Sequence, residues 1–129
     1  RPEEVEIADL ITTSVSLGGP PDVEGIRSSL AFYAGFFPRY NRALVEQGFP
    51  KEASAIRQAY LEGRRGKDLA RLVPDQMVNA IAVVGTPEEC KQRIEEYRRA
   101  GVTLPIIAPR YSGREAKEQI MAVIRALAP

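Results

Sequence analysis

The residues of this chain whose side chains suit ligand binding lie where predicted strands end. Ser14 and Ser16 stand near the C-terminal end of the first predicted strand, residues 5–17, on its polar side. Arg110 follows the last predicted strand, and a helix is predicted to begin just after it, at residues 112–114. Hydroxyls can hydrogen-bond a bound molecule, and an arginine beside the amide-rich start of a helix suits an anion. Two plainer interpretations stay open: a polar strand end capped by water or the next loop, and a surface arginine paired with a carboxylate.

Several other kinds of chemistry are excluded within these residues. The chain has no histidine and a single cysteine, so it offers no Ser–His or Cys–His dyad, no His-ligated metal and no disulfide framework. Cys90 falls on the predicted buried stripe of a helix and reads as a small core residue without a base to activate it. We therefore assign no catalytic residue and no metal ligand to this sequence.

Composition points to an ordinary globular protein. The chain has 129 residues, 44% hydrophobic and 27% charged, with a formal net charge of +1. Nothing in that balance attracts nucleic acid or an anionic membrane, and no apolar run approaches the roughly 20 residues that span a bilayer. The first residues are charged where a signal peptide would be apolar, so a cytoplasmic location is expected. Because the chain starts at Arg1 and not at methionine, we expect further sequence upstream.

The stretch 73–110 predicts one parallel β/α unit. Residues 80–84, AIAVV, form a wholly apolar run that suits a parallel strand covered on both faces. Thr86 and Glu89 form a capping box around Pro87, and Gly101 ends the helix. LPIIAP at 104–109 is the next strand, followed by a final helix. With residues 10–16 as the first strand, we expect three parallel strands that are neighbours in chain order.

The middle of the chain predicts helices. Val23, Ile26, Leu30, Tyr33 and Phe37 recur at helical spacing, so Tyr33 and Phe37 are expected to pack in a core and Phe36 to mark a partner surface. Proline and glycine then divide the region into short helices that end near residue 79. A basic run is read as a solvated helical face, with contact to an anionic cofactor tail as the alternative; it comprises Arg57, Arg64, Arg65, Lys67 and Arg71.

Several of these motifs together resemble a known family. The segment NAIAVVGTPEECKQRIEEYRRAGVTLPIIAP is similar to the C-terminal region of the bacterial-luciferase-like monooxygenase superfamily, and above all to its coenzyme F420-dependent oxidoreductase branch. The upstream text, LAFYAGFFPRYNRALVEQGF followed by VPDQMVNA, agrees with it. The resemblance covers roughly residues 10–129, and several separated motifs occur in the right order.

The resemblance implies an α/β fold: the C-terminal part of a (β/α)₈ TIM barrel, with about three β/α units and a helical insertion. Such a barrel needs about 250 residues, so residues 1–129 are expected to be a fragment of a single barrel domain. The expected partners of this fragment are the remainder of the barrel, a small-molecule substrate and further copies of the protein.

The same resemblance implies a function. The parent protein is expected to transfer a hydride between F420, or alternatively FMN, and a small organic substrate, with the cofactor held mainly by strands outside this chain. Because the C-terminal ends of barrel strands line the active-site mouth, Ser14, Ser16 and Arg110 become the candidate cofactor-binding residues. The isolated piece is expected to be inactive. The alternative from another class is a non-enzymatic α/β module that associates with itself.

Overall fold

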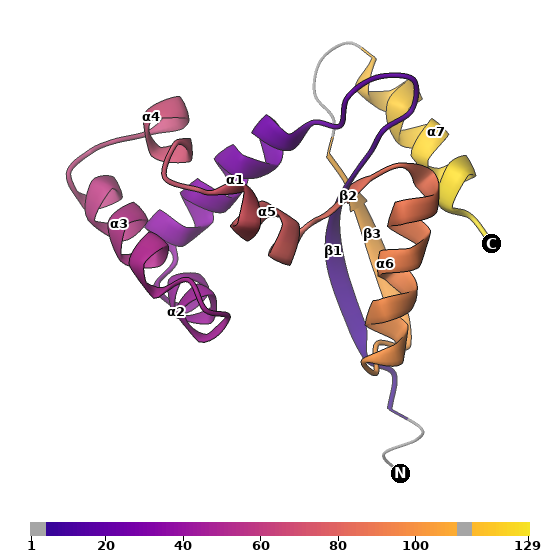
Figure 1. Cartoon of the computed structure of the whole chain (residues 1–129), viewed down its shortest axis with the longest axis horizontal. Coiled ribbons are helices and arrows are strands. Elements are labelled where there is room, and N and C mark those ends of the chain that lie inside the picture. Colours follow the sequence, from indigo (N-terminus) through magenta and orange to yellow (C-terminus); the bar gives the residue numbers. More distant parts are fainter. Residues whose placement is uncertain (1–4, 111–114) are drawn as a thin grey trace. The chain divides into compact units, whose positions relative to one another are not determined.

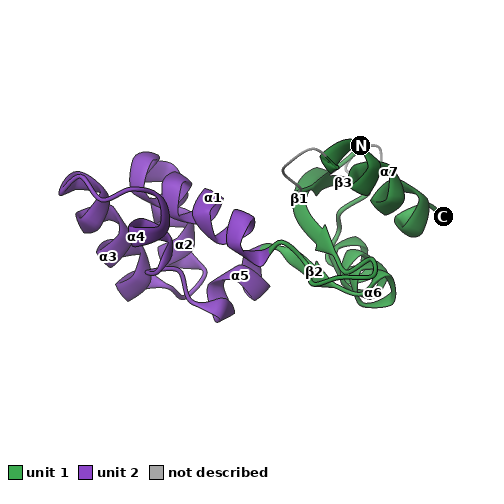
Figure 2. Ribbon diagram, turned by 90° about the horizontal axis from the view of Figure 1, so that it is seen from above, with its two compact units in different colours: residues 1–22, 82–129 green, residues 23–81 purple. Residues whose placement is uncertain are grey.

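The computed structural model describes residues 5–110 and 115–129, with the helices and strands labelled in Figure 1. The chain forms two compact units, coloured separately in Figure 2. The first unit comprises Arg1–Asp22 and Ala82–Pro129 and contains the sheet, and the second comprises Val23–Ile81 and is helical. That both units belong to one barrel domain stays a prediction.

Three parallel strands and two helices make up the described part of the first unit. The strands are β1 (Ala8–Val15), β2 (Val83–Gly85) and β3 (Leu104–Pro109), and the helices are α6 (Pro87–Arg99) and α7 (Ala116–Leu127). The expected parallel direction is confirmed, because β1 pairs in parallel with both other strands. The class is therefore mixed α/β, as expected from the sequence.

The order of the strands differs from the expectation. The sheet runs β2-β1-β3, so β1 and not the strand near 80–84 lies in the middle. β3 pairs with β1 over six residue pairs, whereas β2 pairs only with Thr13–Val15. Residues 80 and 81 are also helical and not part of a strand, because α5 (Asp75–Ile81) continues through them. A short apolar run that starts with alanine suits a buried helix end as well as a strand.

The junction between β2 and α6 agrees with the sequence prediction. The amide of Thr86 donates to the Glu89 carboxylate at 2.8 Å, and the Glu89 amide donates to the Thr86 hydroxyl at 3.2 Å, which completes the capping box. Gly85 has a φ of +152°, and a side-chain carbon there would overlap the Glu89 carboxylate. Glycine is thus required where the chain turns from strand to helix.

The core of the first unit lies between the sheet and its two helices. Ile11 and Val15 of β1 pack with Val83, with Cys90 of α6 and with Val123 of α7. Tyr97 and Leu127 pack against this cluster as partly buried side chains. The predicted burial of Cys90 is confirmed, and Ile94 is buried on the same stripe of α6, whereas Ile124 of α7 is 53% exposed.

The second unit consists of five helices. They are α1 (Val23–Phe36), α2 (Pro38–Glu46), α3 (Pro50–Leu61), α4 (Gly66–Ala70) and α5 (Asp75–Ile81). The breaks fall at the predicted prolines and glycines: α2 begins at Pro38, α3 begins at Pro50, and Gly48 follows α2 with a φ of +99°.

The buried face of α1 was predicted only in part: Ile26 and Leu30 are buried as expected, but the two aromatic residues assigned to the core are not. Tyr33 and Phe37 are 41% and 44% exposed, while Ala31, Ala34 and Gly35 are buried. The reason is close helix packing, because a side-chain carbon at Gly35 would lie 2.7 Å from the Cβ atom of Tyr60 on α3. Small residues let the two helices approach, and the large rings lie beside the contact instead of inside it.

Candidate functional site

One face of the sheet is covered and the other is open. Odd-numbered residues of β1, such as Ile11 and Val15, face the core that α6 and α7 complete. Figure 1 shows both helices on the same side of the strands. The register Leu10↔Ile106 puts these two side chains on the opposite face, where Leu10 is 68% and Ile106 is 43% exposed. Parallel sheets are almost always buried on both faces, so this face lacks its covering layer within the described residues.

The edges of the sheet are open as well. On the β2 side, the described part of β1 is paired only at Thr13–Val15, so Ala8–Thr12 offer free backbone groups along that edge. On the other side, β3 pairs with β1 and with no further described strand. Exposed strand edges of this kind are ready to pair with further strands. Both edges of the sheet therefore carry backbone groups that are unpaired within the described residues.

The open face changes from apolar to polar along the strands. Near the N-terminal ends lie Leu10, Leu104 and Ile106, all more than 40% exposed. Toward the C-terminal ends the same face carries Thr12 and, on β3, Ala108 opposite it. The amide of Arg110 donates to the Thr13 carbonyl at 2.9 Å, which continues the β1–β3 ladder past its last pair. By strand alternation, Arg110 then falls on the same face as Thr12 and Ser14.

The structure shows what the two predicted serines contact. Ser14 is fully buried, and its hydroxyl accepts a hydrogen bond from the Asp22 amide at 2.7 Å. The Ser16 hydroxyl donates to the Gly19 carbonyl at 2.6 Å. Both hydroxyls thus hold the turn that follows β1, as in the plainer interpretation of the sequence.

The three candidate residues do not all come together. The register places Ser14 and Arg110 side by side, while Ser16 lies within the turn after β1. Cofactor contact by all three stays a prediction, and the predicted helix start at 112–114 lies outside the described residues. Thr12 was missed by the sequence analysis, although simple alternation from Ser14 puts it on the same face.

A pocket of about 270 Å³ opens at the same end of the sheet, but on its helix side. It is lined by Val15, Leu17 and Pro20 and by the carboxylates of Glu115 and Glu118 from the start of α7. Two carboxylates make this pocket unfavourable for an anion. A negatively charged group would therefore find its cation on the other side, where Arg110 lies.

Comparison with known proteins gives the family. The luciferase-like monooxygenase family model matches residues 4–104, which is most of the chain. The chain belongs to the luciferase-like monooxygenase family.

Two relatives of this luciferase-like chain carry the same name, 5,10-methylenetetrahydromethanopterin reductase. The protein from Methanolobus tindarius is 30% identical over 103 residues, which cover 79% of this chain and 31% of the relative. The protein from Archaeoglobus fulgidus is 31% identical over 86 residues, which cover 67% of this chain and 25% of the relative. The chain thus spans less than a third of the length of these relatives.

Cys90 of the luciferase-like chain is unsuited to nucleophilic chemistry. It is fully buried in the core of the first unit, and its thiol points its hydrogen toward the Gly85 carbonyl at 3.6 Å. Burial, together with the nearby Glu89 carboxylate, raises the pKa of this thiol to about 11. The neutral thiol is a packing group, as the sequence suggested.

The second unit has a charged pocket of about 350 Å³ around Arg27. The Arg27 guanidinium donates to Asp75 at 2.5 Å and to the Val73 carbonyl, and it contacts Glu24 at 3.2 Å. The hydrogen bond to Asp75 is the main reason that the pKa of Arg27 is raised, against the opposing effect of burial. This arginine connects α1 to α5 and to the turn before α5. Its hydrogen-bonding groups are used within the unit, so its role is structural.

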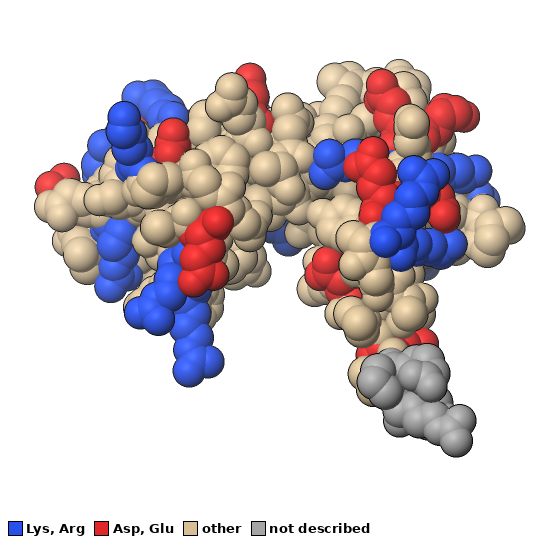
Figure 3. Space-filling view, turned by 60° about the horizontal axis from the view of Figure 1, so that its bottom comes forward, with Lys and Arg blue, Asp and Glu red and all other residues tan. Residues whose placement is uncertain are grey.

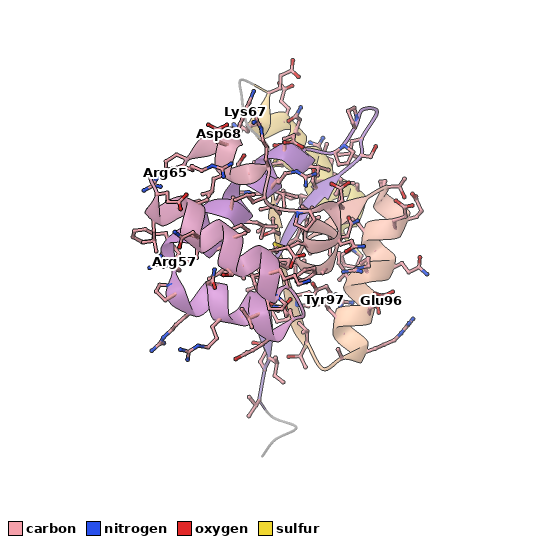
Figure 4. All side chains as sticks on the ribbon, turned by 60° about the vertical axis from the view of Figure 1, so that its left-hand side comes forward. Arg57, Arg65, Lys67, Asp68, Glu96 and Tyr97 are labelled. Carbon is pink, nitrogen blue, oxygen red and sulfur yellow. The ribbon has the colours of Figure 1, made fainter. Side chains whose placement is uncertain are left out.

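The basic run fits the interpretation of a solvated face. Arg57 donates to the Gly35 carbonyl at the end of α1, and Arg65 stacks over the Tyr60 ring at 3.6 Å. Figure 4 labels both side chains on α3 and the turn after it. Lys and Arg are interspersed with Asp and Glu in the space-filling view of Figure 3.

The part of the chain that the structure describes contains neither a membrane-spanning helix nor a cluster of metal-binding side chains. No described helix is long and apolar enough to cross a bilayer. Among the same residues, no group of three or more acidic, cysteine or histidine side chains is placed to hold a metal ion.

Proposed function

We propose that this chain is part of a luciferase-like oxidoreductase that transfers a hydride between coenzyme F420 and a small organic substrate. The observation that carries the proposal is a parallel sheet with one open apolar face and open edges, in a chain that spans less than a third of two relatives named as reductases. Such a sheet fits the wall of a larger enzyme better than a finished domain.

The rest of a (β/α)₈ barrel is the proposed partner of the open face. In a barrel, helices cover the outside of the strands and the inner face fills the centre with side chains. α6 and α7 then lie outside, and Leu10, Leu104 and Ile106 fill the interior. β1 and β3 become adjacent barrel strands, because they pair along six residues. β2 takes a smaller part than the full strand that the sequence suggested, since it contacts only the end of β1.

The proposed cofactor, when bound, accepts or donates a hydride at its deazaflavin ring. This chain would contribute to the rim of the site, at the C-terminal ends of β1 and β3. Arg110 fits a cofactor that carries negative charge, since its guanidinium can bind an oxyanion in two-pronged fashion. Ser14 and Ser16 would act indirectly by holding the turn at the rim. FMN is the alternative cofactor of the same class.

The isolated chain is proposed to be inactive. It has no histidine for proton transfer, and the described strands are too few to close a barrel that needs eight. Most groups that bind the cofactor would come from strands outside these residues. From the family resemblance, the complete protein is also proposed to form a homo-oligomer.

The test compares two proteins: the 129-residue chain and the complete polypeptide that contains it. Reduced F420 or FMN is mixed with candidate pterin-type substrates, and cofactor oxidation is followed by absorbance. We expect oxidation of F420 by the complete polypeptide only. Activity with FMN and not with F420 would select the alternative cofactor, and turnover by the isolated chain would contradict the proposal.

A second candidate function rests on the same open face. Copies of the chain could cover each other's faces and act as a self-associating α/β module without chemistry. Sedimentation of the 129-residue chain separates the two cases when combined with the activity assay. A stable oligomer, together with a complete polypeptide that binds neither F420 nor FMN, would favour the module.

A further inference from the structure

We infer that Thr12 and Arg110 together bind one anionic oxygen group, a phosphate or a carboxylate, of the molecule held at this end of the sheet. The inference rests on the proposed function and deepens it, because it assigns a ligand chemistry to two side chains of this chain. It also changes the site expected from the sequence, since Thr12 takes the place of the two serines.

The pairing of β1 with β3 brings the two residues to the same face. Thr12 lies directly opposite Ala108, and Arg110 follows Ala108 by two residues, just past the end of β3. Strand spacing and rise put the two backbones about 8 Å apart on that face. Since Ala108 is small, it leaves room between them for a ligand atom to approach the strands. An arginine side chain is long enough to meet a group that also touches the Thr12 hydroxyl.

The hydroxyl of Thr12 is free for this role. No hydrogen bond involves its side chain among the described residues, in contrast to the neighbouring hydroxyls of Ser14 and Ser16, which hold the turn. Thr13, next along β1, turns its hydroxyl back to the Ile11 carbonyl at 3.0 Å on the covered side. Thr12 is therefore the hydroxyl of β1 that remains available to a ligand on the open face.

Charge favours the open face for an anion. Arg110 has no carboxylate partner among the described residues, so none of these residues neutralises its charge. The nearby acidic side chains, Glu115 and Glu118, line the pocket on the helix side of the sheet with Val15. The sheet separates these two carboxylates from the guanidinium, whereas Asp22, whose amide donates to the Ser14 hydroxyl, lies beside the open face. An oxyanion on the open side meets one cation and one hydroxyl donor, which is a common pattern for phosphate and carboxylate binding.

The anionic group can come from the cofactor or from the substrate, and the experiment separates these sources. Thr12→Val and Arg110→Gln are made in the complete polypeptide, with Thr12→Ser and Arg125→Gln as matched controls. Thr12→Ser keeps the hydroxyl, and Arg125 is an exposed arginine in the last turn of α7. Affinity is measured by fluorescence for the intact deazaflavin cofactor and for its phosphate-free chromophore, and KM is measured for the substrate.

Loss of a hydrogen bond to a charged group weakens binding by about tenfold or more. If the cofactor supplies the anion, both test variants raise the Kd of the intact cofactor by that factor and leave the phosphate-free chromophore unchanged. If the substrate supplies it, KM rises and both cofactor affinities stay the same. Equal weakening of the intact and phosphate-free cofactors, or no change in any of the three values, would overturn the inference.

A readout that needs no activity keeps the inference separate from the proposed function. Inorganic phosphate is added to the complete polypeptide, and the melting temperature is compared with that in chloride of equal ionic strength. We expect a phosphate-dependent rise for the wild type and both controls, and a smaller rise for Thr12→Val and Arg110→Gln. An identical rise in all five proteins would contradict the site, even if the enzyme proves to use F420.

Discussion

The open face of the sheet and the aromatic surface of α1 are both apolar and exposed, yet they differ in what they reveal. On the sheet, Leu10 and Ile106 lie on paired parallel strands whose edges are unpaired within the described residues, and unpaired strand edges favour pairing with further strands. On α1, Phe32 and Phe36 stack at 5.5 Å and are 44% and 48% exposed, but a helix has no free backbone edge. Backbone pairing identifies the kind of neighbour, whereas exposed rings alone indicate only that a neighbour is favoured.

The largest expected effect separates the two faces of β1. Ile11→Ala removes a side chain that is 2% exposed, and it should lower the free energy of unfolding of the 129-residue chain by about 2–5 kcal/mol. Leu10→Ala, one residue earlier on the open face, should change it by less than about 0.5 kcal/mol. Chemical denaturation of both variants measures the difference. Equal losses would show that the open face is covered within this chain.

The stability of the chain at alkaline pH should show that water does not reach the Cys90 thiol in the core of the first unit. The Cys90 pKa is raised to about 11 in the folded chain, against about 8.5 for an unfolded thiol. The folded state therefore favours the protonated thiol, and this contribution is complete below about pH 8.5 and is lost as pH rises toward 11. The loss amounts to about 2–3 kcal/mol.

Comparison with Cys90→Ala isolates that effect from other titrations. The free energies of unfolding of the two proteins, measured from pH 7 to 10.5, should converge as pH rises if the wild type loses its thiol contribution. Parallel curves would mean that water reaches the thiol.

A smaller effect is expected where α1 meets α3 in the second unit. Gly35→Ala places a methyl group against the Tyr60 side chain and should cost about 1–2 kcal/mol, even though alanine favours the helix itself. Gly19→Ala is the matched control, because a side chain there meets nothing within 4 Å. Thermal melts of the two variants make the comparison. A stabilised Gly35→Ala protein would show that the helices lie further apart than described.

Local signals in the sequence predicted much of the fold. Alternating and apolar runs located β1 and β3, and the capping box at Thr86 located the start of α6, because these signals act over a few residues. Strand order was not predictable in the same way. It depends on pairing between segments far apart in the chain, and the run at 80–84 suited a helix end as well as a strand.

The same distinction applies to the aromatic residues and the candidate site. Hydrophobic spacing assigned Tyr33 to the core, but close packing of α1 on α3 needed small residues, and only the tertiary contact decides that. At the site, the sequence located Ser14 and Arg110 near strand ends, but the pairing of β1 with β3 was needed to place them on one face. The hydrogen bond of the Ser14 hydroxyl depends on how the turn after β1 brings the Asp22 amide back to it, and no local sequence pattern specifies that.

Thiol labelling tests most directly whether the open face is the interior of a larger barrel. Leu10→Cys and Ile106→Cys are introduced separately into the 129-residue chain and into the complete polypeptide, with Phe36→Cys as an exposed reference; the native Cys90 is buried and gives little background. The account predicts rapid modification of both cysteines in the isolated chain and strong protection of both in the complete polypeptide. Equally rapid modification in both proteins would contradict it.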